Sequence, residues 1–125
     1  MANPLLAVNY LADLAIPINR LAKFGTGDRN VTLATAATDF IIGAVNETAI
    51  ALGERADVVR VGIAWVECGA AVPRGSPITA DAVGRAVVAA PAAGINNRII
   101  GFADESGLAA GDVIRFAIAP GLMQG

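Results

Sequence analysis

The chain has 125 residues, of which 55% are hydrophobic and 16% are charged, and its net charge is −2. This length predicts a single domain that can bury a core of its own, while the small charged share predicts apolar groups on the surface. Because the chain has no histidine and one cysteine, it lacks Ser-His-Asp and Cys-His catalytic sets, histidine-containing zinc sites and internal disulfides.

The distribution of charge and hydropathy narrows the expected partners further. The few basic residues are scattered along a mildly acidic chain, which argues against nucleic-acid binding. No uncharged apolar run reaches the ~18 to 20 residues of a membrane-spanning helix. The apolar N-terminus lacks a positive leading region and contains Asp13, so a signal peptide is not expected. We expect a soluble protein with no nucleic-acid or membrane partner.

Residues 1–19 mix apolar side chains with asparagines and prolines and follow no clean period of two or 3.6. We interpret them as an extended N-terminal arm that docks on another subunit, and the alternative is a first strand and loop of the core. In the arm interpretation the apolar side chains are buried only in the complex. The arm residues expected to bind a partner are Asn3, Pro4, Leu5, Leu6, Val8, Tyr10 and Leu11.

From Arg20 onward, turn residues recur at intervals that leave room for strands but not for long helices. Residues 20–125 are therefore predicted to form one all-β domain, a small barrel or sandwich of short strands. Strands are expected at 30–36, 40–45, 57–66, 70–72, 77–79, 85–89, 98–103 and 112–118. Good helix formers at 46–52 predict one short helical turn.

A degenerate internal repeat relates residues 40–66 to residues 98–118. The segment Ile41-Ile42-Gly43 recurs as Ile99-Ile100-Gly101, 58 residues later. The segment DVVRV (57–61) resembles DVIRF (112–116) at an offset of 55, which implies a shorter loop in the second copy. Alternation then predicts one core face made of Val59, Val61, Ile63, Trp65, Ile114, Phe116 and Ile118, with Arg60 and Arg115 together on the opposite face.

Candidate chemical motifs are weak. The glycines of Gly25–Asn30 precede an expected strand rather than a helix, so we interpret the segment as a hairpin turn and not as a nucleotide loop. Cys68 has no histidine to activate it and is expected to be a small buried side chain. Asp104 and Glu105 are neighbours that point to different faces of a strand end, which disfavours catalysis by the two carboxylates as a general acid and base. We predict no catalytic residue, no metal site, no cofactor and no small-molecule substrate.

The order of short segments along nearly the whole chain resembles the small capsid decoration (cement) proteins of tailed bacteriophages. The segments are MANPLL (1–6), RLAKFG (20–25), ATAATD (34–39), IIG (41–43), GERADVV (53–59), GSPITAD (75–81), GRAV (84–87) and IAPG (118–121). The resemblance implies a protein that is not an enzyme, that is made in the bacterial cytoplasm and that binds the outer surface of the expanded head. It also implies homotrimers that clamp adjacent major capsid proteins.

A second resemblance keeps another class of function open. The segment AVPRGSPITAD (71–81) is similar to a hairpin of antifreeze-like β-clip domains, which implies a carbohydrate- or ligand-binding module. Exposed aromatic side chains usually form such glycan sites, and only 5% of the residues here are aromatic. The decoration protein is therefore the preferred interpretation, with the β-clip module as the alternative.

Overall fold

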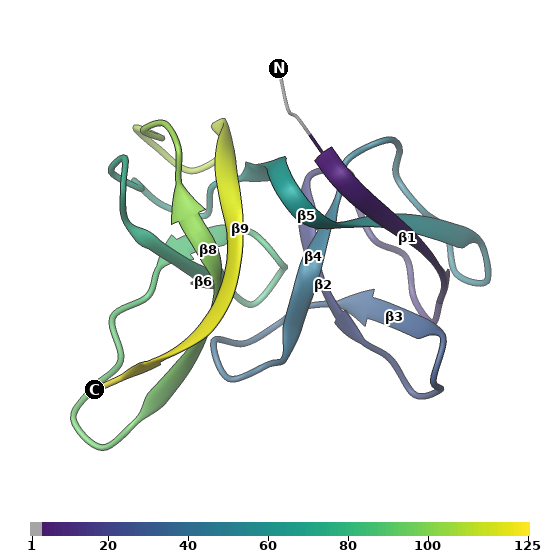
Figure 1. Cartoon of the computed structure of the whole chain (residues 1–125), viewed down its shortest axis with the longest axis horizontal. Helices are drawn as coiled ribbons and strands as arrows, with labels where there is room; N and C mark the ends of the chain where they lie inside the picture. Colours follow the sequence, from purple (N-terminus) through teal and green to yellow (C-terminus); the bar gives the residue numbers. More distant parts are fainter. Residues whose placement is uncertain (1–3) are drawn as a thin grey trace.

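The computed structural model describes residues 4–125, which form a nine-stranded sheet and no helix (Figure 1). The prediction of an all-β chain with short strands is confirmed. The strands are β1 (Pro4–Ala12), β2 (Arg20–Phe24), β3 (Asn30–Leu33), β4 (Ile41–Val45), β5 (Arg55–Glu67), β6 (Pro77–Ala80), β7 (Ala86–Val88), β8 (Asn96–Ala103) and β9 (Val113–Gln124).

Strands β1 to β5 close into a small barrel. Neighbouring strands pair in the order β1, β3, β2, β4, β5, and the antiparallel pairing of β5 with β1 completes the ring. The pairing of β1 with β3 is parallel, whereas the other pairings are antiparallel. Closure removes most free sheet edges, so most main-chain hydrogen-bonding groups of this small unit are paired internally.

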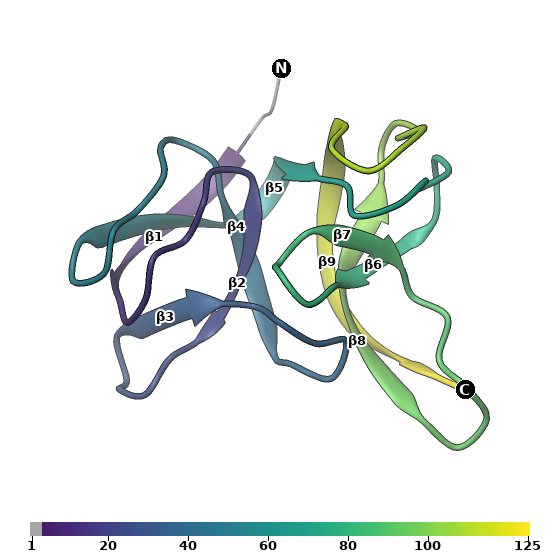
Figure 2. The same cartoon turned by 180° about the vertical axis from the view of Figure 1, so that it is seen from behind.

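The long strand β5 continues out of this first barrel and becomes part of a second one (Figures 1 and 2). There it pairs with β9, and the order continues through β8 and β6 to β7. A parallel bridge between Cys68 and Ala86 brings the end of β5 back to β7. The second set of strands is therefore nearly closed as well, and β5 is shared by both barrels.

The pairing of β4 with β5 in the first barrel is repeated by the pairing of β8 with β9 in the second. In the first barrel Ala44 pairs with Val59, and the equivalent pair 58 positions later is Phe102 with Ala117. Gly43 and Gly101 show why the register is conserved: a Cβ at either position would strike the carbonyl oxygen opposite, of Val59 or Ala117 respectively. Close approach of the paired strands thus requires glycine at both positions.

This register corrects the predicted repeat. The offset of 58 relates both pairs of β4 with β5 to pairs of β8 with β9, and the loops 46–54 and 104–112 have equal length, so the predicted offset of 55 is wrong. Val58, not Val61, is the structural counterpart of Phe116, and both Val58 and Phe116 are fully buried. Val61 is 43% exposed. The predicted core face is right for Val59, Ile114 and Phe116, which share one buried cluster, and Ile118 packs against that cluster. It is wrong for Val61, which is exposed, and for Ile63 and Trp65, which are only partly buried.

Strand β5 is buried on both sides at the junction of the barrels. Val58 packs in the first core, a cluster inside the first barrel, whereas its neighbour Val59 packs in the second core. The second core fills the second barrel and extends between the two. Further along, Ala64 and Val66 are buried while Trp65 is partly exposed. A strand with apolar residues on both faces shows no clean alternation.

Arg60 and Arg115 do not share a face as predicted. Arg115 pairs across the ladder with Trp65 and forms an ion pair with Asp104 at 3.3 Å. The Arg60 guanidinium instead donates to the Tyr10 hydroxyl at 2.6 Å, within the first barrel. The two arginines therefore belong to different barrels and different surroundings.

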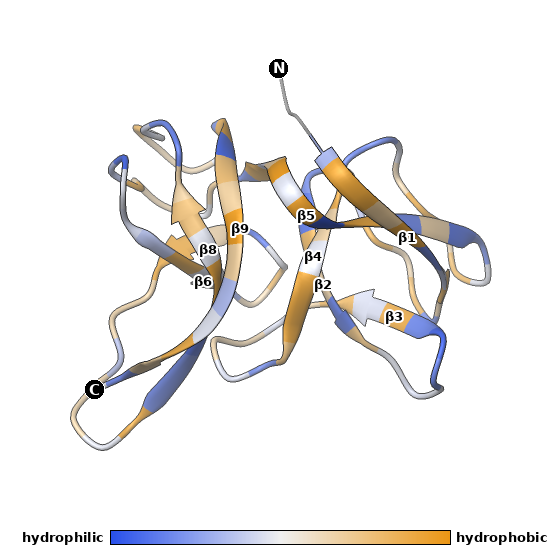
Figure 3. Cartoon of the chain, in the orientation of Figure 1, coloured by the Kyte–Doolittle hydropathy of each residue, from blue (hydrophilic) through white to orange (hydrophobic). Residues whose placement is uncertain are grey.

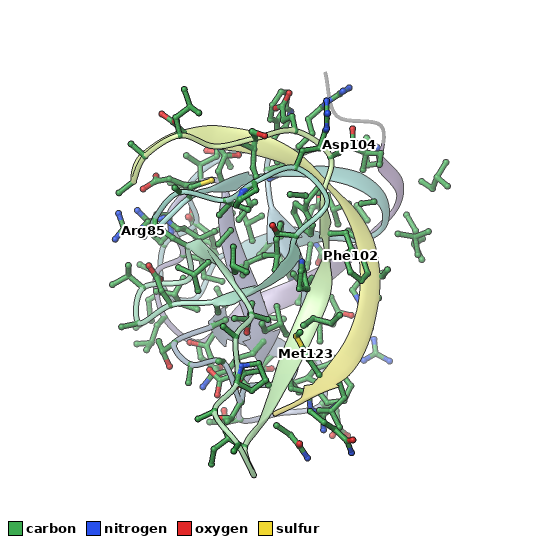
Figure 4. All side chains as sticks on the ribbon, turned by 90° about the vertical axis from the view of Figure 1, so that its left-hand side faces the viewer. Arg85, Phe102, Asp104 and Met123 are labelled. Atoms are coloured by element: carbon green, nitrogen blue, oxygen red, sulfur yellow. The ribbon has the colours of Figure 1, made fainter. Side chains whose placement is uncertain are left out.

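Two further local predictions are wrong. Residues 46–52 form a loop without a helical turn, because Ile50 pairs with Ile16 in an isolated bridge that is incompatible with helical hydrogen bonding. Segment 70–72 contains only a bridge from Val72 to Gly107. Figure 4 views the second barrel from its outer side, with Asp104 towards one end and Met123 towards the other.

Candidate docking surface

The segment predicted as an N-terminal arm is, over its described residues, strand β1 and the turn that follows it. Tyr10 is 7% exposed and Ile16 is fully buried, both in the first core. Val8 packs against the same core, and Leu11 is partly buried. The expectation that these side chains are buried only in a complex is therefore wrong for the inner part of the segment. Asn3 lies outside the described residues.

The outer half of β1 differs from the inner half. Pro4 is exposed, Leu5 is 79% exposed and Leu6 is 49% exposed. Leu6 pairs with the exposed Val61, and Pro4 lies opposite Gly62, whose φ of 103° breaks the regular ladder. Figure 3 shows this apolar stretch of β1 on the outside of the molecule. Leu5, Leu6 and Val61 together form what we call the N-terminal ribbon.

The free side of the ribbon carries unpaired main-chain groups. β1 pairs with β3 only at Leu11 and Ala12, so among the described residues the stretch Pro4–Val8 is paired on its β5 side alone. Its other edge can accept an additional strand. Apolar side chains and an open strand edge at one place are the features expected of a protein-docking site.

The inner half of the segment is held by polar contacts around Asp13. The Asp13 carboxylate accepts hydrogen bonds from the Thr26 N–H at 2.8 Å and from the Asn30 side chain at 2.6 Å. These bonds lower the pKa of Asp13. The predicted Gly25–Asn30 turn is confirmed as the connection between β2 and β3, and Asp13 connects this turn to the end of β1.

The residues considered for catalysis have structural partners. Cys68 is fully buried in the second core, and burial followed by the nearby carboxylates of Asp112 and Glu67 raises the pKa of its thiol. The interpretation of Cys68 as a small core side chain is confirmed. Glu105 accepts a hydrogen bond from the Arg115 N–H at 2.9 Å, and Asp104 pairs with the Arg115 guanidinium. Residues 4–125 contain no cluster of three potential metal ligands and no helix long and apolar enough to cross a bilayer.

One surface feature has no counterpart in the sequence analysis. The rings of Phe24 and Phe40 lie 5.6 Å apart, centroid to centroid, and both side chains are exposed. The Arg60 guanidinium lies over Phe24 and the Arg98 guanidinium lies over Phe40. These side chains come from β5, the end of β2, the loop before β4, and β8, so no local motif could have revealed them.

Asp39, next to this feature, should make stability depend on acid pH. Its carboxylate accepts the Thr35 N–H at 2.9 Å and pairs with Lys23 at 3.1 Å. Partial burial acts to raise the pKa of Asp39, but these partners outweigh it and the pKa is lowered. The folded state therefore holds its proton less tightly than the unfolded state, and stability is lost as pH falls through the folded pKa.

We expect Asp39→Asn to cost about 1 kcal/mol of unfolding free energy at neutral pH. The difference in unfolding free energy between the variant and the wild type should shrink as pH falls below the ordinary aspartate pKa. Urea unfolding at several pH values measures this difference. Asp28→Asn removes the same charge from an exposed turn and should have little effect. If Asp39→Asn cost the same free energy at every pH, Asp39 would not be the source of the acid dependence.

No protein family model matches the sequence, and no curated protein is significantly similar to it. Comparison of solved structures does find a match. The fold resembles the crystal structure of the N base of the head fiber protein gp8.5 of bacteriophage phi29, with a TM-score of 0.67. The alignment covers 91% of this chain and 93% of that one at 19% sequence identity. The chain therefore shares the fold of the N base over most of its length.

Proposed function

We propose that the protein is a structural component of a tailed-bacteriophage head, a decoration (cement) protein bound to the outer surface of the expanded capsid. The observation that carries the proposal is the near-complete fold match to a phage head fiber base. The order of short segments that resembles phage decoration proteins supports the same role independently of that match. In this role the protein is made in the host cytoplasm, acts in the virion and has no enzymatic activity.

The N-terminal ribbon is the proposed contact with the major capsid protein. Its leucines expose apolar area, and its open edge can add a strand of the capsid protein through main-chain hydrogen bonds. Because β1 is already ordered by β5 and β3, docking avoids much of the entropy that a free arm would lose, about 1 to 2 kcal/mol per residue. We propose that three copies act together as a homotrimer, so that modest single contacts suffice to clamp neighbouring capsid subunits.

Binding to expanded heads that lack decoration protein tests the role and the ribbon separately. The wild-type protein should sediment with such heads. The double variant Leu5→Asp/Leu6→Asp should bind at least about ten-fold more weakly, since each leucine contributes roughly 1.5 to 3 kcal/mol when fully buried. Leu108→Asp places a similar charge at a position that is 83% exposed in a loop of the second barrel, and it should bind normally.

The possible failures are distinguishable. If the wild type does not sediment with heads, the proposed role is refuted. If the wild type binds and the double variant binds equally well, the role stands and the ribbon is not the contact. Circular dichroism of the double variant checks that β1 remains paired, because a charged ribbon that unfolded the barrel would lower occupancy for a different reason.

A further inference from the structure

Arg60, Phe24, Phe40 and Arg98 form a continuous row across the junction of the two barrels, which we call the arginine-phenylalanine row. The Arg60 guanidinium carbon lies 5.8 Å from the centre of the Phe24 ring, and the Arg98 carbon lies 4.6 Å from that of Phe40. The rings touch each other at the middle of the row. Phe24 is 43% exposed and Phe40 is 51% exposed. A contiguous aromatic surface of this kind costs free energy in water unless a partner covers it.

The two arginines of the row differ from the other partly buried arginines. Arg20, Arg85 and Arg115 each form an ion pair with a carboxylate. Within residues 4–125, neither Arg60 nor Arg98 has a carboxylate partner, although both are partly buried. Arg60 is held by its hydrogen bond to the Tyr10 hydroxyl, and Arg98 is held by its contact with the Phe40 ring. The row therefore presents two positioned guanidinium groups whose charge is not neutralised.

An apolar hollow extends the row on the side of the second barrel. Phe40 and Arg98 line it together with Ile99, Pro120 and Leu122, of which Leu122 is 53% exposed. The positive groups thus lie within apolar surface and not within a general basic patch. A suitable partner needs carboxylates at defined positions and apolar side chains between and beside them.

We propose that the arginine-phenylalanine row binds an acidic segment of another protein, with carboxylates on Arg60 and Arg98 and apolar side chains on Phe24 and Phe40. Guanidinium groups form strong paired hydrogen bonds with carboxylates, and stacking on an aromatic ring holds the planar group ready to form them. The inference is independent of the phage-head role and would hold for any partner that offers this chemistry.

Charge around the row favours a carboxylate segment over a nucleic acid. Asp39, next to Phe40 in the chain, pairs with Lys23. Lys23 also lines the hollow that Asp13 and Phe24 share, so the surroundings of the row are close to neutral. With a net charge of −2 on the whole chain, the row offers little attraction to a continuous phosphate backbone, whereas a protein segment can place its charges on the arginines alone. In addition, the two rings are tilted by 46° and each carries a guanidinium, so they do not form an open platform for stacked bases.

The length of the row defines a probe. The guanidinium carbons lie at most about 16 Å apart along the contacts, which corresponds to about five residues of extended chain at ~3.3 Å per residue. The probe is a labelled peptide with two glutamates separated by four uncharged residues, two of them leucine. A matched peptide carries glutamines in place of the glutamates.

Peptide titration followed by NMR tests the proposal on the full chain. With the glutamate peptide we expect coupled shifts of the Arg60 and Arg98 side-chain N–H signals and of the Phe24 and Phe40 ring signals. The glutamine peptide should bind about ten-fold more weakly or not at all, because it lacks the charge-assisted bonds. Arg98→Gln should weaken binding of the glutamate peptide by about five-fold or more. Arg74→Gln makes the same change of charge on an exposed loop and should leave binding unchanged.

Three results would overturn the proposal. Equal binding of the two peptides would show that the carboxylates are not recognised, and shifts elsewhere on the surface would show that the row is not the site. Preferential binding of a single-stranded oligonucleotide of similar length would assign the row to polyanions. Because Arg60 donates a hydrogen bond to Tyr10 of the first core, its replacement could disturb that core, and the variant test rests on Arg98. The thermal midpoint of Arg98→Gln must match that of the wild type.

Discussion

Truncation of Phe116 to alanine should lower the free energy of unfolding by about 3 to 5 kcal/mol, the usual cost of a large cavity in a core. Phe116 is fully buried in the second core, on the strand that pairs with both β5 and β8. It pairs with Ala64 on one side and Ala103 on the other, and alanines have little side chain with which to fill the space. Chemical denaturation of the variant measures the loss.

The matched control is Phe102→Ala. Phe102 lies on β8, one residue from the partner of Phe116, but it is on the outer face and 42% exposed (Figure 4). The same truncation there should cost less than about 1 kcal/mol. A loss below that limit at Phe116 would show that the register of β9 is wrong, and equal losses at both positions would show that the two faces are not distinct.

Deletion of residues 1–12 should abolish folding of the first barrel. The deletion removes all of described β1, including Tyr10 and Ala12 of the first core, and opens the ring between β3 and β5. Exposed strand edges and a half-empty core then replace a closed unit. We expect the cooperative unfolding transition to be lost or to fall by more than about 10 °C, since each kcal/mol shifts the midpoint by about 4 to 8 °C in a small domain. Differential scanning calorimetry records it.

A shorter deletion separates the ribbon from the barrel. Removal of residues 1–6 takes away Leu5 and Leu6 but leaves the pairs from Ala7 to Leu11 that close the ring. This variant should keep its unfolding midpoint within a few degrees and lose occupancy on expanded heads. A folded protein after deletion of 1–12 would show that β1 is a dispensable arm. Collapse after deletion of 1–6 would show that the whole strand is structural.

The candidate docking residues illustrate how far the sequence could predict a site. The exposed Leu5 and Leu6 are available to a partner as expected, but Tyr10 and Val8 contribute to the first core. Nothing local separates these leucines from that tyrosine, because the whole segment is apolar and extended. The arginine-phenylalanine row was invisible for a related reason. Phe24 and Arg98 are far apart in the chain and become neighbours of Phe40 only when the two barrels pack together.

The amino-acid sequence by itself determined the class of the fold and part of its symmetry. Turn residues at short intervals exclude long helices, and a strand with one apolar face, such as Val113–Gln124 at Ile114 and Phe116, shows which side chains enter the core. The recurrence of Ile41-Ile42-Gly43 as Ile99-Ile100-Gly101 is also present in the structure. Each of the two glycines faces a carbonyl oxygen of the paired strand, Gly43 that of Val59 and Gly101 that of Ala117.

The tertiary structure alone decided the register of β5 and the place of β1. Val58 and Val59 are adjacent and both buried, one in each core, so no alternation could identify the inner face of β5. Its register follows from closure of two barrels around one strand, which depends on β1 and β9, and both of these strands are distant from β5 in the chain. Local apolar patterns indicate which residues are buried. Which segment buries them depends on packing between strands that are distant in the chain.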